Sequence, residues 1–426
     1  MKSNNKNFMP WVVMIAIGLI SATCLGSSMV LMGSFLSPIS QTMHVSVSVV
    51  SYYYTVLVLV MAVMMPIVPK ILVKINDTII YLIASIVVTI SLLVIGHFNN
   101  IFEFFVIAIL IGISISFMSF VPVGIIVDNW FASKTNLAIG ICWAITSVFQ
   151  GIMSPILGSL IGSIGWQNTL TILAIIVGIL SIPASFLVKF SPESEGRKPY
   201  GAKEKVNESQ TDKGETSQEV VSTHDIVTSA AFWILMILLC LFQFPAVLNQ
   251  MFPTYAISAG FKETVGGFMV TAAMICDIFL NPIIGATCDR LGAEKGSALW
   301  LIVGVVSYIL LIIATNIHSA GLAIFGAGIN DVVYVYLGTG ITAIASSILG
   351  KRAFAKGFSY VSSISFVVGA FAMPLNNYIA EKFNGFNAVY IFFAILIIIA
   401  IILILIGAKN HFDEKSIVND QNIVKE

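Results

Sequence analysis

Long apolar segments recur along almost the whole sequence and restrict what the chain can fold into. Hydrophobic residues make up 58% of the 426 residues and charged residues only 10%, whereas a soluble domain carries about 25% charged residues. A membrane-spanning helix takes about 20 apolar residues. Twelve segments fit, at 10–36, 48–69, 78–96, 101–127, 136–161, 166–188, 230–255, 265–287, 297–314, 320–349, 357–379 and 388–407. The sequence therefore predicts an all-α integral membrane protein with 12 transmembrane helices.

The composition also excludes several classes of protein. A cytosolic enzyme, a nucleic-acid-binding protein and a secreted disulfide scaffold all need a polar surface that this chain lacks. The five cysteines and five histidines show no metal-site or catalytic spacing, so we interpret the cysteines as packing residues. The sequence also has no nucleotide-binding loop. We expect no cofactor, no metal and no enzymatic activity.

The positions of Lys and Arg predict how the chain crosses the membrane. Basic residues concentrate in the cytoplasmic connections of membrane proteins. With twelve spans, all of the 21 Lys and Arg residues except Lys262 and Lys382 fall on the side that holds the two termini. We therefore expect both termini in the cytoplasm and a multi-pass protein of the cell (plasma) membrane.

A polar stretch divides the twelve segments into two sets of six. We predict a six-helix bundle at 1–190, a cytoplasmic linker at 191–228, a second bundle at 229–410 and a cytoplasmic tail at 411–426. Short patterns recur between the halves at nearly one offset: Pro66-Ile67-Val68 matches Pro282-Ile283-Ile284, and Gly165-Trp166-Gln167 matches Gly385-Phe386-Asn387. Internal repeats of this kind are typical of secondary transporters, with the substrate site between the halves.

The strongest short motif follows the eighth segment. Gly285, Asp289, Arg290, Gly292 and Lys295 have the spacing G-x-x-x-D-R-x-G-x-x-K, which resembles the major facilitator superfamily signature between spans 8 and 9. The resemblance implies gating: glycines let helix ends approach, and the charged residues latch one conformation. In the corresponding stretch of the first half only the base is retained, as Lys74. The alternative is an ordinary charged loop.

Further stretches resemble the monocarboxylate transporter and oxalate:formate antiporter families of that superfamily. They include Trp11 with Gly33-Ser34-Phe35, the run from Trp130 to Gly140, and Phe232-Trp233 with Pro253-Thr254-Tyr255. The Asp of the families' span-8 motif is matched by Asp277, but Asn281 replaces the Arg that precedes the proline. The Lys of span 1 is absent around 27–29, and segment 357–379 has no Lys. An anion would therefore need helix dipoles or a protonated acid for its binding.

Two acidic residues lie inside the predicted spans, Asp277 and Asp331. A charge at the bilayer centre costs ~2.5 to 3.5 kcal/mol on insertion scales, so it is retained where it is used or paired. By its match to the family motif we predict that Asp277 couples transport to protons. The alternative is a packing role, with its carboxyl hydrogen-bonded to Asn281 or to a neighbouring hydroxyl.

Other polar residues are candidates for substrate binding. By resemblance to the superfamily, segment 320–349 lines the central cavity. This makes Asn330, Asp331 and Tyr334 candidates, and Asp331 and Tyr334 are three residues apart and so share a helix face. Asn281 and Gln250 complete the predicted substrate site. For each of these residues the alternative is a polar contact between helices.

Together these features predict a secondary active transporter that moves a small organic solute by alternating access, with proton coupling or exchange. The family resemblance implies a mono- or dicarboxylate substrate. The alternative is a transporter or exporter of a cationic or neutral compound, because the interior charges are acidic only. The expected partners are a small-molecule substrate, the lipid bilayer and protons, with no nucleic acid.

Overall fold

The computed structural model describes residues 8–72, 74–98, 100–192, 196–201 and 223–407, so the predicted tail at 411–426 lies outside the described residues. Eleven helical stretches in this part of the chain are long and apolar enough to cross a membrane. The remaining predicted span is split into α8 (Ile101–Ser116) and α9 (Phe120–Trp130). The predicted all-α membrane architecture is confirmed.

The helices of the first half correspond to the first six predicted segments. They are α1 (Met9–Ile20), η2 (Ser21–Leu25), α2 (Gly26–Ser28), η3 (Leu31–Phe35), α3 (Leu36–Met43), α4 (Val47–Val50), α5 (Tyr52–Met64), α6 (Val68–Leu72), α7 (Asp77–Ile95), α8, α9, α10 (Thr135–Ile164) and α11 (Trp166–Ser185). In the second half a short helix precedes the last six segments. These elements are α12 (Thr223–Thr228), α13 (Ala230–Ala246), α14 (Leu248–Ser258), α15 (Glu263–Leu291), α16 (Ala293–Asn316), α17 (Ala320–Val335), η5 (Tyr336–Gly340), α18 (Ile341–Gly369), α19 (Ala372–Lys382) and α20 (Asn387–Gly407).

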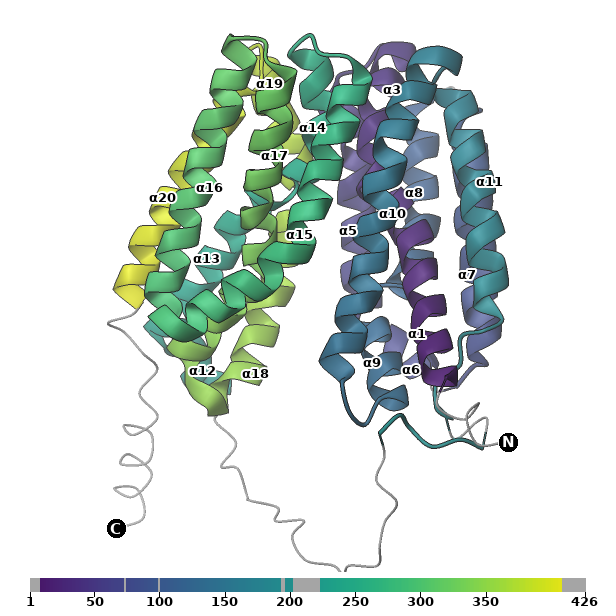
Figure 1. Cartoon of the computed structure of the whole chain (residues 1–426), viewed down its shortest axis with the longest axis vertical. Coiled ribbons are helices and arrows are strands. Elements are labelled where there is room, and N and C mark those ends of the chain that lie inside the picture. The colour runs from purple at the N-terminus through teal and green to yellow at the C-terminus, as the bar shows by residue number, and fades with distance from the viewer. Residues whose placement is uncertain (1–7, 73, 99, 193–195, 202–222, 408–426) are drawn as a thin grey trace, which may run out of the picture.

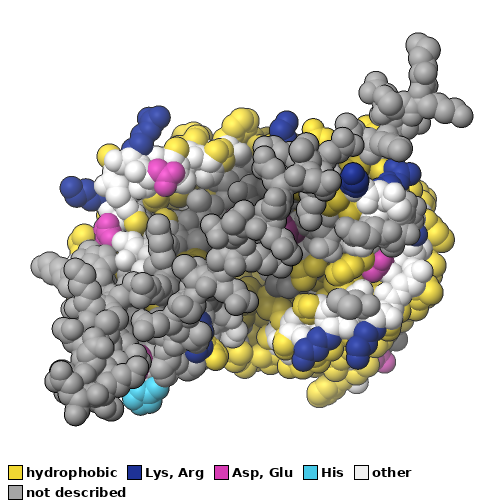
Figure 2. Space-filling view, turned by 90° about the horizontal axis from the view of Figure 1, so that it is seen from below, with side chains coloured by type: hydrophobic (Ala, Val, Ile, Leu, Met, Phe, Trp, Pro, Cys, Tyr) yellow, Lys and Arg dark blue, Asp and Glu magenta, His cyan; other side chains and the backbone are white. Residues whose placement is uncertain are grey.

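The two halves form two bundles that stand side by side (Figure 1). We call the end that holds α12 and the start of α1 the linker face, and the opposite end the distal face. The ribbons of the two bundles converge at the distal face and diverge toward the linker face (Figure 1). Figure 2 shows the linker face, where Lys and Arg side chains lie around the rim.

Exposed apolar stripes explain why the bundles need a lipid environment. On α7 the side chains of Ile79, Ile83, Ile86 and Ile90 are exposed, while Ala84 and Val88 are buried. The exposed residues recur at intervals of three and four, so they form one face of the helix. An exposed isoleucine face on a helix of this hydropathy is suited to contact with acyl chains rather than water.

Two helices are interrupted at comparable places in the two halves. The first segment leaves α-helical geometry at Met29, whose φ and ψ are −103° and −83°, and continues as the 3₁₀-helix η3. The seventh breaks at Val247, between α13 and α14. Side chains from neighbouring helices bond the freed carbonyls: Tyr54 donates to Met29 O at 2.8 Å, and Asn376 donates to Phe244 O at 2.9 Å.

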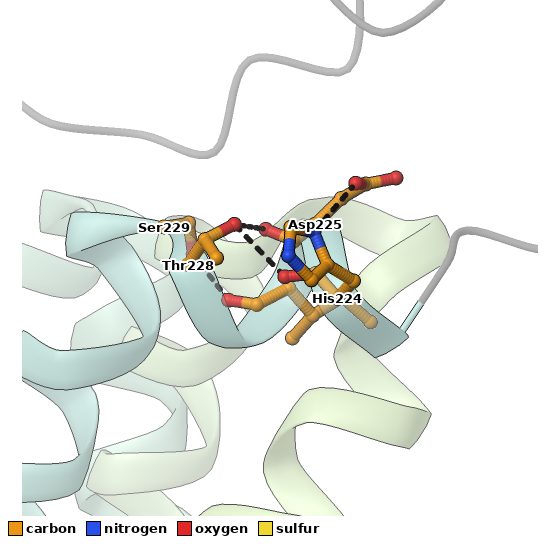
Figure 3. A network of polar contacts seen from close by, with 5 residues as sticks. His224, Asp225, Thr228 and Ser229 are labelled. Atoms are coloured by element: carbon orange, nitrogen blue, oxygen red, sulfur yellow. Dashed lines mark hydrogen bonds and ion pairs between the residues drawn. The ribbon is translucent and has the colours of Figure 1, made fainter.

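Both described ends of the predicted linker pack on the bundles. Tyr200 N donates to Trp130 O at 2.7 Å, and the Tyr200 ring lies against Trp11 and Phe131, with centroids 5.6 Å away in both cases. At the other end Ile226 of α12 is fully buried. Thr228 and Ser229 close the turn into α13 by bonds to His224 and Ile226 carbonyls (Figure 3).

Candidate functional site

Hydrogen bonds join the two bundles near the distal face. The carboxylate of Glu381 on α19 accepts from Ser48 N at 3.0 Å and from Ser48 Oγ at 2.7 Å. Asn377 Nδ2 donates to Ser51 Oγ at 2.6 Å, and Thr55 Oγ1 donates to the carbonyl of Ala370 at 2.7 Å. These contacts run along one side of α4 and α5, so they close this end of the interface.

The backbones of the two broken helices also meet in this region. A Cβ atom added to Gly33 of η3 would overlap the carbonyl oxygen of Gln250 on α14. On the neighbouring pair of helices, a Cβ on Gly267 of α15 would overlap the backbone of Pro155 on α10. Glycine permits these approaches because it has no side chain. The arrangement is closed at the distal face, and the bundles separate toward the linker face (Figure 1).

Asp277 lies at the middle of this interface. Its Oδ2 accepts from Ser147 Oγ of α10, in the opposite bundle, at 2.9 Å. Its Oδ1 accepts from Asn281 Nδ2 at 3.1 Å, and Asn281 Oδ1 accepts from Thr339 Oγ1 at 2.8 Å. Asp277 is partly exposed and Asn281 is exposed. The network therefore connects both bundles through one partly exposed carboxyl group.

The directions of these bonds define the chemistry of the site. Thr339 donates to Asn281, while Asn281 and Ser147 both donate to Asp277, so the carboxyl acts as the acceptor throughout. Thr339 belongs to η5, a π-helical turn, and such turns frequently occur at functional sites. The packing alternative predicted that Asp277 bonds to Asn281 or to a neighbouring hydroxyl. Both bonds are present, but the hydroxyl is that of Ser147, which belongs to the other bundle.

Asp331 occupies a different environment. It is fully buried, and its Oδ1 accepts from Asn249 Nδ2 of α14 at 2.7 Å. Its Oδ2 has no hydrogen-bond partner among the described residues. Asn249 lies two residues after the break at Val247. Asp331, which belongs to α17, is thus enclosed in this conformation and bonded to the start of α14.

The other predicted substrate residues are distributed over several environments. Asn330 is buried and donates to Ser307 Oγ of α16 at 2.9 Å. Tyr334 is 39% exposed, although it lies on the same helix as Asp331. Gln250 is buried at the contact with Gly33. The structure therefore leaves Asp277, Asn281 and Tyr334 reachable in this state and encloses the remaining three predicted residues.

The predicted gating residues lie at the linker face. Asp289 and Arg290 are exposed at the end of α15, and Gly292 connects α15 to α16 with φ +86°, a conformation that favours glycine. The close approach of the two helix ends occurs at Gly296, where an added Cβ would lie 2.9 Å from Cys288 Cα. Gly285 instead faces Thr339 at an ordinary contact distance. Lys74 is exposed before α7.

Three residues of this arrangement were not predicted from sequence. They are Ser147 and Thr339, which complete the Asp277 network, and Asn249 as the partner of Asp331. Single hydroxyl and amide groups are common in membrane helices, so the sequence held no signal that distinguished these from others. No cluster of three or more His, Cys, Asp or Glu residues in the described part of the chain is suited to hold a metal ion.

The fold and the central acid define a class of protein. Two helical bundles closed at one face, with broken helices and polar groups at the mid-depth interface, are the architecture of a secondary transporter. The family model described as Major Facilitator Superfamily matches residues 17–269 and 258–421. The chain therefore belongs to the major facilitator superfamily, a family of membrane transporters of small molecules rather than enzymes.

Solved structures show the same fold at low sequence identity. A mutant of the nucleoside transporter NupG matches with a TM-score of 0.73 and 13% identity, covering 94% of this chain and 99% of that one. A D-xylose-proton symporter matches with a TM-score of 0.71, 11% identity and coverages of 93% and 97%. An inward-facing structure of a bacterial homolog of the human lysosomal transporter Spinster matches with a TM-score of 0.65 and 13% identity, covering 97% of each chain. A search of curated proteins finds no match.

Proposed function

We propose that the protein is a proton-coupled secondary transporter in which Asp277 binds and releases the coupling proton. The observation that carries this proposal is the Ser147–Asp277 hydrogen bond, which places a partly exposed carboxyl directly on the interface between the bundles. A hydrogen bond to an ionised acceptor contributes about 1.5 to 3 kcal/mol, against about 0.5 to 1.5 kcal/mol for a neutral pair. Protonation of Asp277 therefore changes how strongly the bundles are held at mid-depth.

Ser147 has two acceptors for one hydroxyl proton. Its Oγ lies 2.9 Å from Asp277 Oδ2 and 3.2 Å from the carbonyl oxygen of Trp143. An ionised Asp277 takes the hydroxyl proton as an acceptor. A protonated Asp277 can donate to Ser147 instead, and the hydroxyl then turns to Trp143. Ser147 accommodates both protonation states without moving its helix.

The chemistry of the site favours a cationic or neutral hydrogen-bonding solute. Asp277, Asn281 and Tyr334 present a carboxyl, an amide and a phenol from the second bundle. Among the described side chains, Lys and Arg lie near the ends of the predicted spans or in connections. Lys356 lies within α18 but close to its kink at Gly350, between two predicted spans, so none supplies a fixed positive charge at this depth. An ionised acid attracts cations and accepts bonds from hydroxyl and amino groups.

A small carboxylate is the second candidate, supported by the resemblance of the Trp130–Gly140 stretch to carboxylate transporters. Its binding would require Asp277 to carry the proton, so that the carboxyl donates rather than repels. Under this alternative, substrate and proton bind together.

An uptake experiment separates the two candidates. Proteoliposomes are given labelled formate, oxalate, lactate or pyruvate in one series and small amines, polyols or nucleosides in another, each at pH 5.5 and 7.5. We expect accumulation in the second series to follow the imposed pH gradient, by about tenfold per pH unit for each proton moved. Accumulation of a carboxylate alone would select the alternative, and transport that ignores pH would contradict proton coupling.

The proposed orientation places the linker face in the cytoplasm, in agreement with the basic rim of that face (Figure 2). In a variant whose native cysteines are replaced, we expect an impermeant maleimide added to intact cells to label Asn384→Cys at the distal face. We expect Asp289→Cys at the linker face to be labelled only after the cells are opened. Both positions are exposed, so the opposite pattern would invert the orientation.

A further inference from the structure

The buried carboxyl of Asp331 has fewer hydrogen-bond partners than a buried charge requires. The side chain is fully buried and receives one bond, from Asn249, while its second oxygen is unpartnered within the described residues. Leaving a buried charge without partners costs far more than leaving a neutral hydroxyl unbonded. Within the described part of the chain, no Lys or Arg side chain bonds to this carboxyl. A carboxyl in this setting holds a proton.

The position of Asn249 connects this carboxyl to the distal closure. Asn249 lies just beyond the break between α13 and α14, and the next residue, Gln250, presents the carbonyl that meets Gly33. The Asp331–Asn249 bond therefore fixes the start of α14 in the place where it contacts the first bundle. Opening of the distal face requires α14 and η3 to separate at this point.

We infer that Asp331 is a second proton-binding group, distinct from Asp277, which is protonated while the distal face is closed and ionises when that face opens. Opening would bring water to the start of α14 and stabilise the charged carboxylate. Asp331 is thus a positioning residue for the gate rather than a substrate ligand. The inference deepens the proposed proton-coupled transport and rests on it.

The expected pH dependence follows from proton counting. The distal-closed state binds one proton more than the distal-open state at Asp331, and lower pH favours the state that binds more protons. The titratable groups that face Asp331 are Asp277 and Cys276 from α15 and Tyr334 from its own helix; Asn249 from α14 carries no charge. Asp277 is the other carboxyl among these groups, so the test must remove it.

The experiment measures the distal opening directly and needs no substrate. Nitroxide labels on Ser163→Cys and Lys262→Cys, exposed positions at the distal ends of α10 and of the turn before α15, report the distance between the bundles by double electron–electron resonance. All variants share one background without native cysteines. In Asp277→Asn we expect the ratio of distal-closed to distal-open molecules to rise as pH falls from 8 to 5, by up to tenfold per pH unit. In Asp277→Asn/Asp331→Asn we expect that slope to vanish.

A matched variant tests whether the pH dependence of distal closure comes from Asp331. Asp128→Asn removes an exposed acid on α9, outside the predicted gate, and is expected to leave the slope unchanged in the Asp277→Asn background. A slope that persists in the double variant would overturn the inference. If the double variant fails to fold, the infrared band of a neutral carboxyl in Asp277→Asn decides. It should be present at pH 5 and weaken toward pH 8 in step with the distal-closed population, and a band that does not follow that population would overturn the inference. Absence of proton-driven uptake in the parent protein, together with an intact slope in Asp277→Asn, would instead contradict the proposed function and leave this inference standing.

Discussion

Replacing Asp277 by asparagine is expected to abolish proton-driven accumulation while substrate exchange across the membrane continues. Asparagine keeps the size of the side chain, and its amide oxygen still accepts from Ser147, so the interface persists. The amide does not titrate, so the proton bound by Asp277 is no longer carried across the membrane. The pH-dependent closure inferred for Asp331 remains in this variant, but it exchanges its proton on the distal side alone and moves none across. With an imposed gradient of one pH unit, accumulation should fall from about tenfold to none for a single coupled proton.

Counterflow of labelled substrate, measured in the same proteoliposomes, serves as the control for folding and binding. Ser147→Ala should weaken coupling less than Asp277→Asn, because it removes one donor and keeps the titrating group. Retention of full pH-driven accumulation by Asp277→Asn would remove the assignment of Asp277.

Replacing Gly33 by alanine is expected to prevent the distal face from closing. The new methyl group would overlap the Gln250 carbonyl, which belongs to backbone and cannot turn away. Overpacking a close interface costs about 1 to 3 kcal/mol, which shifts the balance between closed and open states by roughly five- to 150-fold. We expect transport to fall by a similar factor and thiol access to Ser48→Cys from the distal side to rise.

Gly140→Ala is the matched control for this change. Gly140 also lies within a helix of the first bundle, and an added Cβ there meets no atom within 4 Å. It should transport at the rate of the parent protein. If Gly33→Ala leaves both transport and Ser48→Cys access unchanged, the contact with Gln250 is not part of the closing interface.

The length of the apolar segments predicted the spanning helices, because the thickness of the bilayer sets the same requirement for each of them. Helix α7, with its exposed isoleucine stripe, is an example: an apolar segment of this length can be identified from the sequence without knowing which helices pack against it. The split of the fourth span was not predicted. At the break, Ser116 and Ser119 donate to the carbonyls of Gly112 and Ser116 in the last turn of α8, and hydropathy alone does not register such an interruption.

The candidate site was predictable only in part. Asp277 was identified because a charge within a span is conspicuous, but its partner Ser147 was not, because pairing depends on which faces of α10 and α15 meet. Spacing placed Asp331 and Tyr334 on one helix face, yet one is enclosed and the other 39% exposed. That difference arises from α14, which covers Asp331 through Asn249. Residue spacing within one helix does not show which neighbouring helix packs over a given side chain.

The docking of Tyr200 bears on how the protein can be divided. Tyr200 is bonded to the α9–α10 connection and packed on Trp11, so it belongs physically to the first bundle although it follows the last helix of that bundle in sequence. Ile226 belongs in the same way to the second. Two polypeptides produced separately should therefore reassemble if the chain is cut between Gly201 and Thr223. A cut at 190 would remove an aromatic anchor from the half that needs it.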